Sequence, residues 1–201
     1  MRSLLIYALA IVFFFSACKG KDKSGTTTIT TDNGKTTLTV DPSKTETVAN
    51  EMQKKTEELK KLAPMTLDQI KAMFPEELLG MKRSSFNANA MMGFASADAE
   101  YKKDDTSNVK LTVMDCAGEA GSSFYALNYW TKMTMESEND QGYTKTVDFL
   151  GGKAVEDYKK YNNSYTLTFT ANDRLLITLQ GTNVSLDLLK DAAKALNLKA
   201  T

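Results

Sequence analysis

The stretch Tyr165-Thr-Leu-Thr-Phe-Thr-Ala171, joined by Asn172-Asp173 to Arg174-Leu-Leu-Ile-Thr-Leu-Gln180, decides the fold. Its apolar side chains recur at alternate positions: Tyr165, Leu167, Phe169, Leu175, Ile177 and Leu179. A period of two gives a strand one face for the core and one for water. The short connection suits an antiparallel hairpin, so the stretch predicts two neighbouring strands of one sheet.

Segments on the N-terminal side of this hairpin show the same strand pattern. They are Met81–Ala88, Met91–Lys102, Asn108–Ala117, Tyr143–Leu150 and Lys153–Lys160. The connections between them are short or turn-forming, as at Gly151-Gly152, which favours antiparallel pairing.

Helix signals precede, interrupt and follow these strands. The expected helices, with their starting residues, are 44–63 (Ser43 and Glu46), 66–74 (Thr66 and Gln69), 123–136 (Ser122 or Ser123) and a closing helix through Leu196 (Ser185). Apart from the short second helix, the order is α-βββ-α-ββββ-α. It predicts an α+β fold with a largely antiparallel sheet of about six to seven strands and helices mainly on one face.

The first residues resemble the signal peptide of a bacterial lipoprotein. Arg2 precedes an apolar run from Leu4 to Phe15 that is too short to span a bilayer, and the sequence Phe15-Ser16-Ala17-Cys18 resembles a lipobox, with Phe in place of the usual Leu. The resemblance implies cleavage before Cys18 and attachment of lipid chains, palmitate among them, to that residue. It also implies a location in the cell envelope, and Lys19 in place of Asp favours the outer over the inner membrane.

The chain is thereby divided into four parts. Residues 1–17 are the expected signal peptide, and 18–43 form a polar tether rich in Thr and Lys. Within it, 26–40 flank Asp32-Asn33-Gly34 and can form a hairpin. Residues 44–63 are the charged amphipathic helix, which either lies on the domain or pairs with a partner helix, and 64–201 are the globular α+β domain.

Composition excludes several classes of function. Lys and Arg together number 25, as do Asp and Glu, so the charge balance argues against a nucleic-acid partner. The chain contains no histidine, which removes Ser-His-Asp and Cys-His catalysis and histidine zinc sites. With Cys18 lipidated, Cys116 has no disulfide partner, and its strand-like surroundings predict a buried thiol. We therefore expect no metal, no cofactor and no catalytic residue.

The segment from Phe124 is more apolar than one sheet-facing stripe requires. Tyr125, Tyr129 and Met133 recur at intervals of four, with Trp130 beside them. Such residues suit a partner surface or a groove for an apolar small molecule. The alternative is that the helix is central in the core.

Carboxylates are the remaining candidates for chemistry. Asp98 and Glu100 share one face of a predicted strand. A glycoside hydrolase would need two carboxylates facing each other across a cleft, and a calcium site would need a loop of several oxygen ligands. Neither spacing is evident here.

The end of the chain resembles small bacterial envelope domains of the PsbP/Mog1-like type. The resemblance lies in Gly142-Tyr143, in Gly151-Gly152-Lys153-Ala154, in 164–169 and 174–179, and in the closing 186–196 segment. It implies a fold, namely strands followed by a packing helix, and no functional residue.

The sequence thus predicts a lipid-anchored, non-enzymatic envelope protein with a binding or assembly role. Its partners would be the membrane, through the lipid, and another envelope component. The alternative is a carrier or sensor of a small apolar ligand held between the sheet and the aromatic helix.

Overall fold

The computed structural model describes residues 25–31, 34–40, 42–91 and 93–198; the side chains of 25–46, Trp130 and Thr131 lie outside that description. The expected signal peptide, Cys18 and the turn 32–33 also fall outside it. In chain order the elements are β1 (Gly25–Thr31), β2 (Gly34–Val40), α1 (Pro42–Lys60), α2 (Leu67–Lys71), β3 (Glu77–Leu78), β4 (Met81–Met91), β5 (Phe94–Lys102), β6 (Asn108–Asp115), α3 (Gly118–Leu127), the 3-10 helix η1 (Tyr129–Lys132), β7 (Met135–Asn139), β8 (Gly142–Phe149), β9 (Gly152–Lys159), the 3-10 helix η2 (Lys160–Asn162), β10 (Ser164–Ala171), β11 (Leu175–Thr182) and α4 (Leu186–Ala195).

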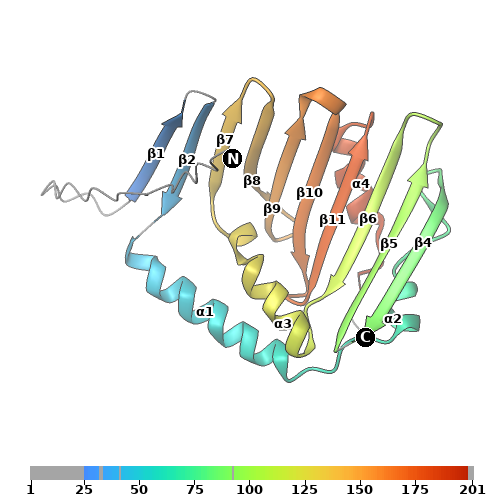
Figure 1. Ribbon diagram of the computed structural model, residues 1–201, viewed down its shortest axis with the longest axis horizontal. Coiled ribbons are helices and arrows are strands. Elements are labelled where there is room, and N and C mark those ends of the chain that lie inside the picture. The colour runs from blue at the N-terminus through green and yellow to red at the C-terminus, as the bar shows by residue number, and fades with distance from the viewer. Residues whose placement is uncertain (1–24, 32–33, 41, 92, 199–201) are drawn as a thin grey trace, which may run out of the picture.

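The strands of the described chain form one antiparallel sheet in the order β1-β2-β7-β8-β9-β10-β11-β6-β5-β4-β3 (Figure 1). Two meanders, β3 to β6 and β7 to β11, meet where β6 pairs with β11. The predicted α+β class with an antiparallel sheet is confirmed. The predicted count of six to seven strands is too low, because the sheet has 11 strands and the prediction missed β3 and β7 and placed β1 and β2 in the tether.

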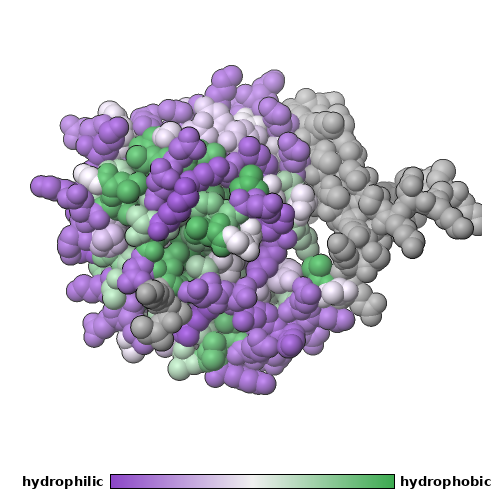
Figure 2. Space-filling model, turned by 180° about the vertical axis from the view of Figure 1, so that it is seen from behind, coloured by the Kyte–Doolittle hydropathy of each residue, from purple (hydrophilic) through white to green (hydrophobic). Residues whose placement is uncertain are grey.

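Helices cover both faces of this sheet, which corrects the expectation of one covered face. Leu175, Ile177 and Leu179 pack in the larger core with α2 and α4, and we call this side the α4 face. Leu176 points the opposite way and packs in a smaller core with α1 and α3, on the α3 face. Figure 1 shows α1 and α3 side by side and α4 behind β11 and β6, and Figure 2 shows hydrophobic residues between polar ones as seen from behind.

The helix before β7 begins and ends earlier than predicted. It starts at Gly118, so Ser122 and Ser123 lie inside it, and it stops at Leu127. Gly118 has φ +81°, and a Cβ there would lie 2.6 Å from the carbonyl oxygen of Gly93. Glycine therefore allows the helix to start directly beside the β4–β5 turn. The residues expected to complete the helix form η1 and then β7, which begins at Met135.

Of the other three predicted helix starts, two are confirmed and one is wrong. The capping box of Thr66 and Gln69 at α2 is confirmed, as is Ser185 as the N-cap of α4. The predicted capping box at Ser43 is wrong, because α1 begins at Pro42 and Ser43 lies inside it. Proline suits the first helical position because it has no N–H to leave unpaired.

The hairpin expected within the tether is present as β1 and β2. It continues the sheet, since Lys35 to Leu38 of β2 pair with Glu138 to Met135 of β7. An isolated hairpin is marginal in water, and this pairing is what supports it.

Candidate functional site

The residues predicted to form a partner surface lie around α3 and η1. Tyr125 is 4 % exposed and Tyr129 is 9 % exposed, and both pack with Leu59 of α1 and Leu176 of β11. Their rings meet edge to face, with centroids 5.9 Å apart. These two tyrosines are therefore core residues, as the alternative interpretation expected, and neither ring is available as a surface.

Met133 and Trp130 are the other two residues predicted to form the partner surface. Met133 is 42 % exposed and lies in the turn after η1. The backbone of Trp130 belongs to η1, and its side chain lies outside the description.

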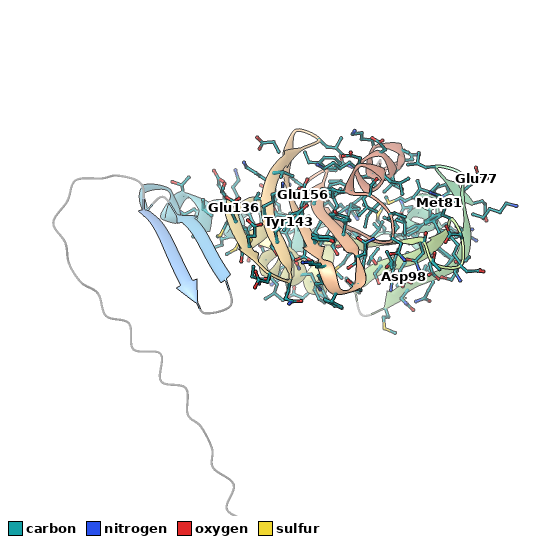
Figure 3. The ribbon with its side chains drawn as sticks, turned by 90° about the horizontal axis from the view of Figure 1, so that it is seen from above. Glu77, Met81, Asp98, Glu136, Tyr143 and Glu156 are labelled. Carbon is teal, nitrogen blue, oxygen red and sulfur yellow. The ribbon has the colours of Figure 1, made fainter. Side chains whose placement is uncertain are left out.

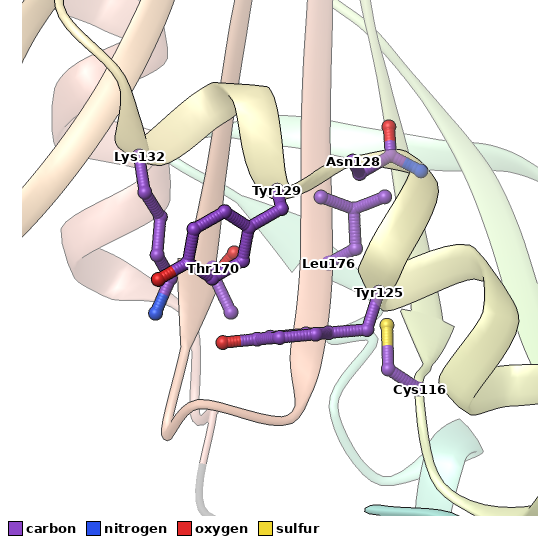
Figure 4. Close-up of a pocket in the computed structure, with 7 residues that line it drawn as sticks. All are labelled: Cys116, Tyr125, Asn128, Tyr129, Lys132, Thr170 and Leu176. Carbon is purple, nitrogen blue, oxygen red and sulfur yellow. The ribbon is translucent and has the colours of Figure 1, made fainter. Parts of the chain in front are cut away.

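A charged pair closes the outer end of this aromatic cluster. Lys132 Nζ lies 2.7 Å from Asp173 Oδ1. The same nitrogen lies 5.5 and 5.9 Å from the ring centroids of Tyr125 and Tyr129, and Figure 4 shows these three side chains together. Burial raises the pKa of the Tyr125 hydroxyl. The hydrogen bond from Lys132 lowers the pKa of Asp173. The Lys132–Asp173 pair therefore holds the hydroxyl ends of Tyr125 and Tyr129 in place.

The space inside the cluster is filled. The hollow among Cys116, Tyr125, Tyr129 and Leu176 leaves no room for a water-sized sphere. The described side chains therefore offer an apolar ligand no cavity between the sheet and α3.

The thiol at the base of this cluster is inert. Cys116 is 1 % exposed, and burial raises its pKa to about 12. Its predicted burial is confirmed, and a thiol that stays protonated is a poor nucleophile.

The part of the α3 face that α1 and α3 leave uncovered is polar. Cross-strand pairing places one polar row across β8, β9, β10, β11, β6, β5 and β4. The polar row consists of Thr144, Asp157, Thr166, Gln180, Lys110, Glu100 and Ser85. With neighbouring strands about 4.8 Å apart, the polar row is about 29 Å long.

Two hollows lie towards the ends of this row. One, of about 310 Å³, is lined by Ser85, Asp98, Glu100, Asn108, Lys110, Gln180 and Thr182. The other, of about 250 Å³, includes Thr144 and Asp157 together with Tyr161, which is 75 % exposed. The lining offers donors and acceptors of both charges, which suits a polar or zwitterionic partner better than an apolar one.

The charges in the first hollow are only partly engaged. Glu100 Oε1 accepts a hydrogen bond of 2.8 Å from Asn108 Nδ2. Glu100 stands opposite Lys110 in the β5–β6 register, but the two make no ion pair. Lys110 therefore presents its ammonium group to solvent. The Asp98–Glu100 pair belongs to this open surface, and the hydrolase hypothesis gains no support from it.

Two buried carboxylates that sequence reasoning missed hold elements together. Asp115 is fully buried, and its oxygens accept hydrogen bonds from the backbone N–H groups of Met65 and Ala117 at 2.7 and 3.1 Å. Arg174 donates to both oxygens at 2.7 and 2.8 Å and also binds the carbonyl of Ala63. This network fastens the segment between α1 and α2 to the sheet.

The second is Glu156 on the α4 face, 1 % exposed. Lys190 Nζ of α4 lies 2.6 Å from one of its oxygens and Lys145 Nζ lies 3.4 Å from the other. Figure 3 shows Glu156 near Tyr143 and Glu136, away from the β3–β4 end. Two ammonium groups neutralise the buried charge, so this carboxylate ties α4 to the sheet. A charge at a core-facing position of an alternating strand was the available signal for both residues.

The described residues contain no cluster of three metal-ligating acidic or cysteine side chains. None of the helices within the described ranges is long and apolar enough to cross a membrane. Comparison of the chain with protein-family models, with curated proteins and with solved structures found no match.

Proposed function

We propose that this chain is a lipid-anchored, non-enzymatic protein of the bacterial cell envelope whose sheet binds another envelope component. The observation that carries the proposal is the lipobox-like Phe15-Ser16-Ala17-Cys18 after a short apolar segment. Lipid chains at Cys18 would supply the attachment, at about 0.8 kcal/mol for each buried methylene. The outer membrane is the favoured location.

The geometry supports a domain held close to its anchor. Only Lys19 to Ser24 separate Cys18 from β1. Six residues span at most about 22 Å when fully extended, at about 3.6 Å each. The β1 edge would therefore stay near the bilayer.

The binding role is assigned to the polar row and its hollows on the α3 face. The aromatic cluster is packed, whereas the polar row is exposed and its Lys110 makes no ion pair with Glu100. We expect a partner that carries polar groups of both charges. The apolar-carrier alternative finds no cavity at the place where it was expected.

The attachment is tested first. Cells that make the chain are fed a fatty-acid analogue, and the protein should incorporate it and partition with membranes. Cys18→Ala should lose the label and move to the soluble fraction, whereas Cys116→Ala should keep both. Equal labelling of Cys18→Ala would end the anchored interpretation.

The binding role is tested by crosslinking the anchored protein in its own membranes and identifying what is recovered. Lys110→Glu should reduce recovery of a specific partner at least fivefold. Lys71→Glu, an exposed lysine on α2 without an ion pair, is the matched control. If Trp130→Ala abolishes recovery and Lys110→Glu leaves it intact, the partner binds at η1 and the assignment to the polar row fails.

A further inference from the structure

One edge of the sheet is open along most of a long strand. β4 runs from Met81 to Met91, whereas β3 pairs only with its first two residues. The backbone N–H of Arg83 donates a hydrogen bond of 2.9 Å to the carbonyl oxygen of Glu76. From Ser84 onward, no described segment pairs with the outer side of β4. Eight residues therefore have no neighbour on that side, and those whose backbone groups point outward, about every second one, are unpaired.

Most of the usual protections of an edge strand are missing here. Edge strands are normally kept apart by charged side chains, proline or strong bulges. Ser84 to Met91 reads Ser-Ser-Phe-Asn-Ala-Asn-Ala-Met, with no charge and no proline, and the register shift between Arg83 and Ser85 affects only its first residues. A neutral strand with small side chains is easily approached by another backbone.

Exposed apolar side chains flank this edge. Leu67 of α2 is 47 % exposed, Leu79 of the β3–β4 turn is 47 % exposed, and Met91 is 63 % exposed. The elements that carry them form β4 or pack beside it. Water is therefore in contact with apolar surface on the same side of the molecule as the open backbone.

We infer that the occupant of this edge is a second copy of the chain, paired antiparallel through β4 about a two-fold axis. Phe86 and Ala88 pack against the α4-face core, whereas the alternate residue Asn87 faces the other way. Paired residues must share a face, which sets the axis at Asn87 or at Ala88.

Charge favours this self-pairing. In either register, the basic pair Lys82-Arg83 of one copy falls opposite or beyond Met91 of the other, so no like charges meet. The side chains on the α3 side are then Ser85, Asn87 and Asn89, and an amide can both donate to and accept from its counterpart. A two-fold contact also closes on itself and leaves no further edge of this kind.

The size of the contact sets its strength. An axis on Asn87 or Ala88 pairs seven residues of each copy, 84–90 or 85–91, over about 24 Å at about 3.4 Å each. A contact of that length and one strand wide belongs with the small, weak interfaces that bury less than about 1,200 Å². The dimer should therefore dissociate in the micromolar range.

The test uses the full chain in detergent, by sedimentation over a concentration series from 1 to about 200 μM. The wild type should pass from monomer to dimer. Asn89→Lys, which adds the usual edge protection, should raise the dissociation constant at least tenfold. Gln180→Lys places the same charge on an exposed residue of a central strand and should leave it unchanged. A wild type that is monomeric throughout, or that forms species larger than a dimer, overturns the inference.

A disulfide test locates the contact. A residue on the axis faces its own copy at a distance that a disulfide spans. Asn87→Cys or Ala88→Cys should therefore crosslink under mild oxidation. Thr28→Cys, at the centre of β1 on the opposite edge, is the matched control. Crosslinking at residue 28 with none at 87 or 88 would show that the copies meet at the wrong edge and would overturn the inference.

Discussion

Replacement of Asp115 by asparagine tests whether the buried network fastens the α1–α2 segment to the sheet. Asparagine has nearly the same shape but only one acceptor oxygen, so its amide nitrogen must face donors from Arg174 or the backbone. The Arg174 side chain is 16 % exposed and can recover little hydration. Removing one partner of a buried pair costs about 3–5 kcal/mol. Arg174 keeps its hydrogen bond to the Ala63 carbonyl in the variant, so we expect the lower end of this range. The free energy of unfolding should fall by about 3 kcal/mol.

The assay is urea unfolding followed by circular dichroism, with Asp173→Asn as the matched control. Asp173 adjoins Arg174 and pairs with Lys132, but its side chain is 61 % exposed. Exposed pairs contribute about 0.2–1 kcal/mol. With a urea slope of about 2 kcal/mol per molar, Asp115→Asn should lower the midpoint by about 1.5 M and the control by less than 0.5 M.

A second readout separates loss of the fastening from general destabilisation. Ala63 and Met65 lie between α1 and α2, next to Lys60 and Lys61. Trypsin under native conditions should therefore cut Asp115→Asn at these lysines first. Equal midpoints for Asp115→Asn and Asp173→Asn, with unchanged cleavage, would refute the reasoning.

Three further predictions concern single groups. Cys116, with its pKa raised to about 12 by burial, should resist iodoacetamide at pH 8 in the folded protein and react on unfolding, as mass spectrometry would show; rapid native labelling would contradict the burial. The Lys132 hydrogen bond lowers the pKa of Asp173 from 3.8, so the stability that the ionised carboxylate contributes is present above pH 3.8 and is lost as the pH falls through the lower pKa of the folded state. The difference in unfolding free energy between wild type and Asp173→Asn should therefore disappear in unfolding titrations at acid pH. A difference that persists there would exclude the Lys132–Asp173 pair as its cause. A Cβ on Gly181 would lie 2.3 Å from Val184 Cγ2 and 2.9 Å from Leu189 Cδ2, so Gly181→Ala should lower thermal stability by about 1–3 kcal/mol, and a neutral result would mean that the base of α4 can shift.

The strands were predictable because their signal is local. Each of the seven predicted strands corresponds to an observed one, since an alternating side-chain pattern needs no knowledge of the partner strand. β7 escaped because Met135 extends an apolar run that begins at Phe124, and the chain's change from helix to strand there depends on pairing with β8. The two-residue β3 is too short to show any period.

The buried carboxylates were predictable in part. Asp115 follows Leu111 and Val113 on the core-facing side of its strand, and Glu156 follows Ala154 in the same way. A charge at such a position indicates a buried partner, because an unpaired carboxylate there is costly. The partner itself could not be identified, since Arg174 lies 59 residues from Asp115 along the chain.

The apolar excess of the aromatic segment led the sequence argument to a partner surface because one covered face was assumed. If only one face of the sheet is covered, a helix with two apolar sides can bury one of them against the sheet, and the other has nothing to pack against. The structure supplies that place, since α1 crosses α3 and brings Leu59 against Tyr125 and Tyr129. The charged helix, which was expected either to lie on the domain or to pair with a partner helix, thus completes the smaller core, and the aromatic residues need no outside partner. The polar remainder of the α3 face, which α1 and α3 leave uncovered, is therefore the surface to which we assign the proposed binding role.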